Sequence, residues 1–262
     1  MALTTNELFS RIKPSQIREF DELFRSVEDC IPMTIGEPDF DMPENVKQAA
    51  IKAIEDNASH YAHTSGEIGV RKAVSEFLEK QYDLHYDPET EIVMTVGATE
   101  GLFAAAFGLL NPGDQVIIPS PFFPLYSYAV ELNRGECILV DTSDTDFLMT
   151  PELLHKTMAK NKNVKAIFLN YPSNPTGATY TKEELTALAD AIKQYDIFVL
   201  SDEIYSEITY GEKHTSIATM LRDRTILFQG ASKAFAMTGW RVGVLAADAK
   251  WMKTLFLAHQ QL

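Results

Sequence analysis

The amino-acid sequence predicts an α/β protein in which a mainly parallel sheet of seven strands is covered by helices on both faces, in three αβα layers. Two observations support this fold class. Beyond residue 90, short apolar runs alternate with helical patterns along the chain. The runs are apolar at consecutive positions, which is typical of parallel strands that are buried on both faces.

Seven runs carry this strand signal: residues 92–96, 115–119, 137–140, 164–170, 197–201, 225–229 and 242–247. One of the helices between them is predicted to begin with a capping box, in which Thr181 and Glu184 exchange hydrogen bonds. Its apolar stripe follows: Leu185, Leu188, Ala189 and Ile192. Such a stripe faces a core, so this helix is expected to pack on the sheet.

Two further helices are predicted before the first strand. The first follows Asp41 and has Pro43 in its first turn, with this stripe: Val46, Ala49, Ala50, Ala53 and Ile54. The second carries another stripe: Val70, Ala73, Val74, Phe77 and Leu78. We expect both stripes to be core faces. The residues before these helices lack a sustained period and are interpreted as an arm.

Composition excludes several classes of partner. The chain has 37 acidic and 23 basic side chains, a net charge of −14, so neither nucleic acid nor an anionic membrane is expected as a partner. Its longest uncharged apolar run, 101–113, is too short to cross a bilayer. Cys30 and Cys137 lie far apart, which suits a reducing cytoplasm. The six histidines show no zinc-site spacing, so no metal is expected.

Ligands of such sheets bind outside the carboxyl ends of the strands, so the residues after each apolar run form a map of the site. Residues 97–99, Gly-Ala-Thr, follow the first run and open a helix, where free backbone N–H groups can bind an anion. The segment SPFFPLY, 120–126, brings aromatic side chains to the same edge. On their own, aromatic residues such as Tyr126 indicate core packing more than a ligand platform.

Polar side chains follow the next two runs. Asn174 stands in a loop made rigid by proline, where the alternative is a plain turn. Asp202 and Tyr205 follow the run 197–201, and a carboxylate placed there is expected to be partly buried and to need a cation or strong donors. The alternative for Asp202 is an exposed cap. Glu203 and Glu207 are expected to be solvated.

Lys233 and Arg241 stand in the stretch GASKAFAMTGWRVG, 230–243, which is otherwise small or apolar. A partly desolvated lysine is a usable amine nucleophile and can form a Schiff base with a carbonyl compound. An arginine can donate two parallel hydrogen bonds to a phosphate. Together with the groups above, they match the needs of pyridoxal 5'-phosphate: an amine, a carboxylate for its ring nitrogen, donors for its phenolate and an anion site.

With these motifs the sequence resembles the class I/II aminotransferases of the fold type I pyridoxal-phosphate enzymes. The resemblance runs from about Ile35 to the end and rests on IGEPDF, YPSNPTG, LSDEIYSE and SKAFAMTGWRVG. It implies a large cofactor-binding domain over 41–262, and an arm with a small-domain segment over 1–40. The family's C-terminal small domain, with the arginine that binds the substrate carboxylate, has no counterpart up to Leu262, so the chain is expected to be a fragment.

The resemblance also implies roles for single residues. Lys233 would form the Schiff base and move a proton between the substrate and the cofactor. Asp202 would keep the ring nitrogen protonated. Asn174 and Tyr205 would bind the phenolic oxygen, and Phe123 would stack on the ring.

Other implied roles concern the phosphate and the substrate. Ala98 and Thr99, through their backbone N–H groups, and Arg241 would bind the phosphate. Many relatives carry a phosphate-binding serine where this chain has Gly230, which leaves that contact to Ser232 or to the backbone.

The resemblance implies two further contacts, one with a neighbouring subunit and one with the substrate. Tyr61 would reach the phosphate of a neighbouring subunit, so the active form is expected to be a homodimer. Gly36, together with Asn174, would lie beside the substrate carboxylate.

The implied activity is transfer of an amino group from an L-amino acid, of the aromatic or N-acetyl-diaminopimelate type, to a 2-oxo acid such as 2-oxoglutarate. One alternative is a carbon–sulfur β-lyase on the same fold. The other is a non-catalytic remnant that binds the cofactor and lacks the substrate arginine.

Overall fold

A computed structural model describes residues 3–10, 12, 16–31 and 33–262. The chain divides into two compact units, residues 1–41 and 42–262. The first unit contains a 3-10 helix, η1 (Glu7–Ser10), and the α-helix α1 (Gln16–Arg25). The helix α1 was not expected from the sequence. Within this unit, the Asp21 carboxylate accepts hydrogen bonds from Arg25 at 2.7 Å and from Thr34 at 2.9 Å.

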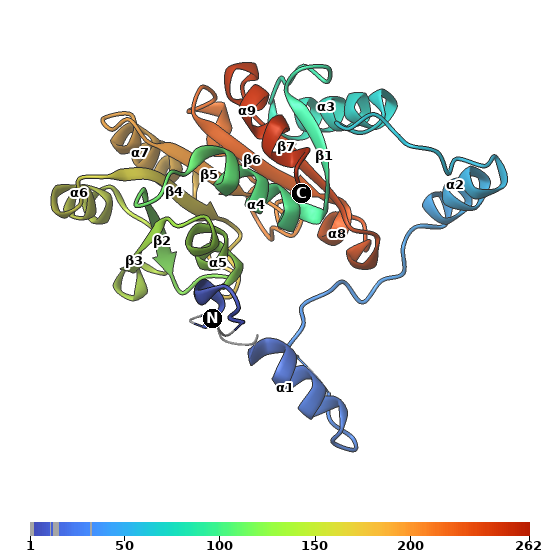
Figure 1. The fold of residues 1–262 in the computed structure, drawn as a ribbon, viewed down its shortest axis with the longest axis horizontal. Helices are drawn as coiled ribbons and strands as arrows, with labels where there is room; N and C mark the ends of the chain where they lie inside the picture. Colours follow the sequence, from blue (N-terminus) through green and yellow to red (C-terminus); the bar gives the residue numbers. More distant parts are fainter. Residues whose placement is uncertain (1–2, 11, 13–15, 32) are drawn as a thin grey trace. The chain divides into compact units, whose positions relative to one another are not determined.

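The second unit is built around one seven-stranded sheet with the strand order β1-β7-β6-β5-β4-β2-β3 (Figure 1). The strands are β1 (Ile92–Val96), β2 (Gln115–Ser120), β3 (Glu136–Asp141), β4 (Val164–Asn170), β5 (Phe198–Asp202), β6 (Thr225–Gly230) and β7 (Val242–Ala246). Only β7 among them runs antiparallel to its neighbours. This confirms the mainly parallel sheet. It also means that the start of β7 lies at the same edge as the carboxyl ends of the other six strands.

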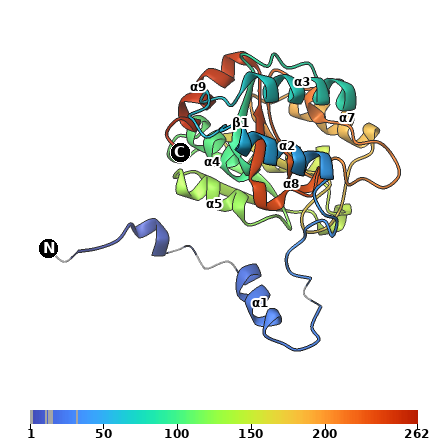
Figure 2. The same cartoon turned by 90° about the vertical axis from the view of Figure 1, so that its right-hand side faces the viewer.

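Helices cover both faces of the sheet, as predicted. One face carries α4 (Gly97–Leu109), α5 (Leu125–Leu132) and α9 (Ala249–His259). The other face carries α3 (Ile68–Tyr82), α6 (Pro151–Lys160) and α7 (Lys182–Ile192). Figure 2 shows α4, α5 and α9 on one side of the strands and α3 and α7 on the other.

Alternating strand residues fill the two cores. Leu200 of β5 belongs to the core beneath α4 and α5, whereas its neighbour Val199 belongs to the core beneath α6 and α7. The strands are therefore apolar at consecutive positions because both of their faces are buried. The capping box of α7 is confirmed: Glu184 N–H donates to the Thr181 hydroxyl at 3.2 Å, and Thr181 N–H donates to the Glu184 carboxylate at 2.8 Å.

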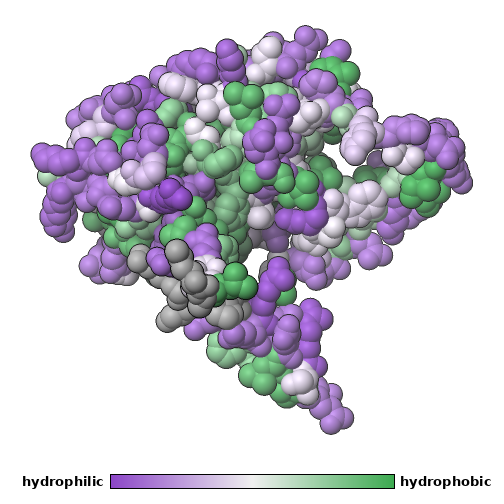
Figure 3. Space-filling model, in the orientation of Figure 1, coloured by the Kyte–Doolittle hydropathy of each residue, from purple (hydrophilic) through white to green (hydrophobic). Residues whose placement is uncertain are grey.

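The two earlier helices differ in burial. In α3, Leu78 is fully buried, but Val70 is exposed. The helix α2 (Glu44–Glu55) contains no buried residue, and Ile54 is 78% exposed. The prediction that the α2 stripe is a core face is therefore wrong: a periodic stripe indicates an amphipathic helix, but not which surface covers it. Figure 3 shows apolar surface over α2. Pro43 precedes this helix as its N-cap.

Short elements complete the second unit: η2 (Ser143–Thr145), η3 (Ile217–Thr219), α8 (Ala231–Ala234) and η4 (Thr238–Trp240). The helix α9 begins after its cap Asp248, whose carboxylate accepts a hydrogen bond from the N–H of Lys250 at 3.0 Å. It ends at His259, although a helical pattern was expected up to the last residue. Within the described ranges, no helix has the length and apolar character that crossing a membrane requires.

Candidate active site

The first part of the site is the start of α4, where the helix packs closely on β7. Gly97 has a φ of +72° and its N–H donates to the Arg241 carbonyl oxygen at 2.8 Å. A Cβ on Gly243 would overlap the backbone of Gly97, so this contact requires glycine in β7. The close packing aims the free N–H groups of the first turn of α4 at the carboxyl edge of the sheet.

Arg241 adds positive charge at the same place. Its guanidinium lies across Gly97 and within 3.4 Å of the Thr99 hydroxyl, and it donates to the Thr238 carbonyl oxygen at 3.0 Å. The side chain is exposed, as is Thr99, while Ala98 is half-buried. An arginine beside the N-terminus of a 13-residue helix is an arrangement that can bind an anion such as a phosphate.

The backbone around Gly230 leaves little room for a side chain. A Cβ on Gly230 would lie 2.8 Å from the Val242 carbonyl oxygen, so any larger residue requires the backbone to shift. Ser232 is 8% exposed. Its contact with a phosphate stays a prediction.

Asp202 ends β5 on the face that carries α5, and it is 4% exposed. Its carboxylate accepts a hydrogen bond from the Tyr126 hydroxyl at 2.8 Å and from Ile204 N–H at 3.2 Å. Burial raises the pKa of Asp202 to about 6, against the two hydrogen bonds, which lower it. The buried position predicted for Asp202 is confirmed, and the exposed-cap alternative is wrong.

Tyr126 was expected to be an aromatic core residue, and no contact with Asp202 was predicted for it. It is buried and lies in α5. Burial, followed by the nearby Asp202 carboxylate, raises the pKa of Tyr126 well above its usual value. The hydroxyl therefore stays protonated and donates to Asp202. No sequence signal marks this hydrogen bond, because 76 residues separate the partners.

A chain of amide contacts joins the loop after β4 to β5. The Asn174 side-chain amide lies 3.5 Å from the Tyr205 hydroxyl, and Asn174 N–H donates to the Asn170 side chain at 2.7 Å. Asn170 in turn donates to the Asp202 carbonyl oxygen at 2.9 Å. Asn170, which the sequence analysis missed, thus links the two strand ends that carry Asn174 and Asp202.

Lys233 lies in α8, close to Tyr205. Its ammonium nitrogen is 5.6 Å from the centre of the Tyr205 ring, and the lysine side chain is half-buried. Burial raises the pKa of Tyr205, with a smaller contribution in the same direction from Asp202. The structure therefore brings together a lysine amine, a phenol and an amide that the sequence placed after three different strands.

These groups fit the cofactor that the resemblance implies. Asp202 is buried, and its carboxylate accepts hydrogen bonds from two neutral donors, the Tyr126 hydroxyl and the Ile204 N–H. A buried carboxylate of this kind suits a ligand that brings its own N–H cation. Pyridoxal phosphate also needs an amine, hydroxyl and amide donors, and an anion site. The Lys233 amine, the Tyr205 hydroxyl, the Asn174 amide and the N-terminus of α4 match these needs.

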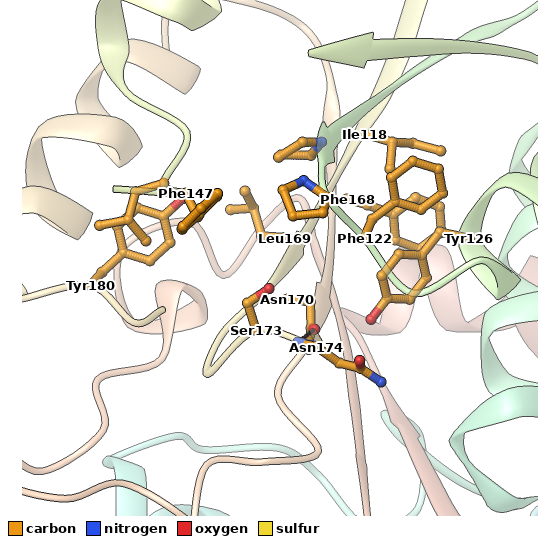
Figure 4. A pocket seen from close by; sticks show the side chains of 13 residues that line it. Ile118, Phe122, Tyr126, Phe147, Phe168, Leu169, Asn170, Ser173, Asn174 and Tyr180 are labelled. Atoms are coloured by element: carbon orange, nitrogen blue, oxygen red, sulfur yellow. Dashed lines mark hydrogen bonds between the residues drawn. The ribbon is translucent and has the colours of Figure 1, made fainter. Parts of the chain in front are cut away.

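Phe123 lies beside Tyr126, with ring centres 5.9 Å apart and planes nearly perpendicular. The same edge holds an open cleft. Figure 4 shows Phe122 and Tyr126 on one side of it, Phe147 and Tyr180 on the other, and Asn174 at its border. Five of the 13 residues that line the cleft are aromatic, and Asn174 at its border faces Tyr205.

Two predicted site residues are not part of this cluster. Tyr61 lies in the loop between α2 and α3 and is fully exposed. Gly36 belongs to the first unit, residues 1–41. Their roles at a neighbouring subunit's phosphate and at the substrate carboxylate stay predictions.

Glu203 is buried, whereas a solvated side chain was expected from the sequence. The residue is 0% exposed, and its carboxylate accepts hydrogen bonds from four side chains: Tyr171, Ser201, His214 and Ser216. The donors come mostly from distant segments, so the strand pattern could not reveal them. Glu207 is exposed, as expected, and accepts a hydrogen bond from Tyr82.

Comparison with known proteins agrees with this geometry. The sequence matches the family "Aminotransferase class I and II" over residues 28–261. The chain belongs to this family. It is 44% identical over 249 residues to the "Probable N-acetyl-LL-diaminopimelate aminotransferase" of Bacillus subtilis, covering 95% of this chain and 63% of the relative. It is 37% identical over 254 residues to "Aromatic-amino-acid aminotransferase 2" of Thermococcus litoralis, covering 95% of this chain and 64% of the relative.

A solved structure of the family has the same fold. The aspartate aminotransferase of Thermus thermophilus with maleate superposes with a TM-score of 0.93 at 35% identity, over 99% of this chain and 69% of that chain. The seven-stranded sheet described above is therefore that of the aminotransferase large domain. The present chain spans 63% of the length of the Bacillus subtilis relative.

Proposed function

We propose that this aminotransferase-family chain binds pyridoxal 5'-phosphate and serves transfer of an amino group between an L-amino acid and a 2-oxo acid. The observation that carries the proposal is that Lys233, Asp202 and the N-terminus of α4, with Arg241 beside it, lie at one edge of the sheet. Each of these features occurs alone in proteins with other functions. Their combination matches the amine, carboxylate and anion site that this cofactor requires.

When bound, the cofactor supplies an aldehyde and an electron-withdrawing ring. Lys233 would hold the aldehyde carbon and carry the proton that leaves the substrate α-carbon. Asp202 would hold a proton on the ring nitrogen. Asn174 and Tyr205 would donate to the phenolic oxygen, and Phe123 would pack against the ring.

The phosphate would be held by groups that stand apart from the reacting atoms. The backbone N–H groups of Ala98 and Thr99, the Arg241 guanidinium and the Ser232 hydroxyl would supply its donors. These groups would position the cofactor, because a phosphate held at one end of the molecule orients the ring at the other end.

The organisation of the whole protein is also part of the proposal. Residues 41–262 would form the cofactor-binding large domain, and residues 1–40 would form the arm and a small-domain segment. Tyr61 would bind the phosphate of a second copy, which makes the active form a homodimer. Gly36 and Asn174 would contact the substrate carboxylate.

The proposed amino donor is an amino acid of the aromatic or N-acetyl-diaminopimelate type, with 2-oxoglutarate as acceptor. The names of the two relatives support these classes. Assays with each donor plus 2-oxoglutarate, in parallel with cystathionine, test the choice. Release of sulfur product from cystathionine without transamination would instead support a carbon–sulfur β-lyase.

The cofactor proposal is tested by adding pyridoxal phosphate to the purified chain, recording the visible spectrum and reducing with borohydride. We expect mass spectrometry of the digested protein to find the reduced cofactor on the peptide containing Lys233. Lys233→Ala should abolish this product, whereas Lys213→Ala, which changes an exposed lysine, should retain it. Labelling of Lys233→Ala at the wild-type level would refute the assignment.

A further inference from the structure

Both oxygens of the buried Glu203 carboxylate accept hydrogen bonds. One oxygen accepts hydrogen bonds from the hydroxyls of Ser201 at 2.8 Å, Ser216 at 2.8 Å and Tyr171 at 3.1 Å. The other oxygen accepts from His214 at 2.8 Å. Desolvation makes an unpaired carboxylate costly, so four donors at this site represent a strong, specific arrangement.

The donors belong to three segments of the chain. Ser201 and Glu203 itself lie at the end of β5, next to Asp202. Tyr171 directly precedes the loop that carries Asn174. The third segment, 214–216, comes before η3 and supplies two donors. Glu203 therefore connects the strand end that holds Asp202 to the loop that holds Asn174.

Glu203 and Asp202 point to opposite faces of the sheet. Asp202 contacts Tyr126 on the α5 face, whereas Glu203 contacts Tyr171, which belongs to the core on the α6 and α7 face. The backbone between them is also held, because Glu203 N–H donates to the Phe228 carbonyl oxygen at 3.0 Å. Glu203 thus lies outside the set of groups that reach the candidate cofactor site.

His214 is enclosed by aromatic rings. Its side chain is 1% exposed, stacks on Tyr171 with ring centres 5.1 Å apart, and meets the edge of Tyr82 at 5.5 Å. Its Nδ1 atom is buried without a hydrogen-bond partner. Donation from Nε2 to Glu203 leaves a lone pair, and no N–H, unpaired at Nδ1, so this tautomer is the favourable one.

We propose that Glu203 and His214 are positioning residues for the cofactor: together they hold Tyr171, at the end of β4, against the end of β5, so that Asn174, Asp202 and Tyr205 face the ligand. This inference rests on the proposed function. Glu203 and His214 would support the site from the opposite face of the sheet. They would act through the backbone, without contact with a reacting atom. Small displacements of groups that contact a ligand have large effects on binding, which gives such support its importance.

The test measures pyridoxal phosphate affinity and the pH dependence of the visible band in four variants. Glu203→Gln keeps one acceptor oxygen and replaces the other by an NH2 group, which cannot accept the hydrogen bonds made there now. His214→Leu removes the donor while keeping an apolar side chain between the two rings. His214→Gln restores a donor. Leu154→Ala, in the same core but in α6, is the control for lost stability, because it empties a fully buried position away from Glu203.

We expect Glu203→Gln and His214→Leu to weaken cofactor binding about ten-fold or more and to shift the pH midpoint of the band. His214→Gln should stay close to wild type. Leu154→Ala should lower the melting temperature without either change. If Glu203→Gln does not fold, the comparison of His214→Leu with His214→Gln decides.

Wild-type affinity and band in His214→Leu would overturn the inference, and so would equal weakening in Leu154→Ala. These results leave the proposed function intact, provided that wild type gives the borohydride-reducible band on Lys233. If wild type gives no such band, the proposed function fails, and this inference fails with it.

Discussion

Asp202 and Glu203 are adjacent buried carboxylates with opposite surroundings. Asp202 accepts two hydrogen bonds, from Tyr126 and Ile204, and burial raises its pKa to about 6. Glu203 accepts four, and all of its donors are side chains. The strand that carries both residues sends one to each face of the sheet.

The difference separates a carboxylate that holds the fold together from one that is available to a ligand. A fully hydrogen-bonded buried carboxylate stabilises the segments that donate to it, and removing it leaves those donors unpaired. An incompletely bonded one is costly to the protein until a ligand supplies the missing partner. Burial alone would have classed the two residues together.

The largest expected effect that separates them is on stability. Glu203→Ala leaves four buried donors without their acceptor and should lower the free energy of unfolding by about 3–5 kcal/mol. Asp202→Ala should lower it by about 1 kcal/mol or less, because the substitution also removes a poorly compensated buried charge. Urea unfolding of both variants at pH 7 measures this, and a larger loss in Asp202→Ala would contradict the comparison.

A second effect is the pH dependence of the cofactor-free protein. The pKa of Asp202 rises from 3.8 to about 6 on folding. Between these two pH values the folded state therefore retains a proton that the unfolded state has lost. Stability from this group is complete below pH 3.8 and is lost as the pH rises through about 6. The shift corresponds to about 3 kcal/mol.

Asp202→Asn does not titrate and serves as the matched control. The difference in unfolding free energy between wild type and this variant should grow to the disadvantage of wild type as the pH rises from about 4.5 to 7. Urea midpoints across that range measure it. A constant difference would show that burial does not raise the pKa of Asp202.

The smallest effects concern single donors. Tyr126→Phe removes one of the two donors of Asp202, and Ser201→Ala removes one of the four donors of Glu203. Both should lower stability by about 1–2 kcal/mol. Only Tyr126→Phe should also raise the pKa of Asp202 further, because the lost hydrogen bond lowers it. The pH series above, repeated in both variants, detects this; a shift with Ser201→Ala would contradict it.

Much of the site could be predicted because parallel strands end at one edge. Asn174, Asp202 and Lys233 were identified as residues that follow apolar runs, and the structure places them at that edge with Asp202 buried. The contacts of Tyr126 and Asn170 with Asp202 could not be predicted in this way, because these hydrogen bonds join residues that are 76 and 32 positions apart.

The sequence by itself determined the α/β class, the seven strands and the capped helix α7, because these depend on periodicity and on local hydrogen bonds. Only the tertiary structure decided that Glu203 is buried and that the apolar stripe of α2 has no buried residue. The physical reason is the same in both cases. Burial depends on which distant segments pack against a side chain, and neither a strand run nor a helical stripe contains that information.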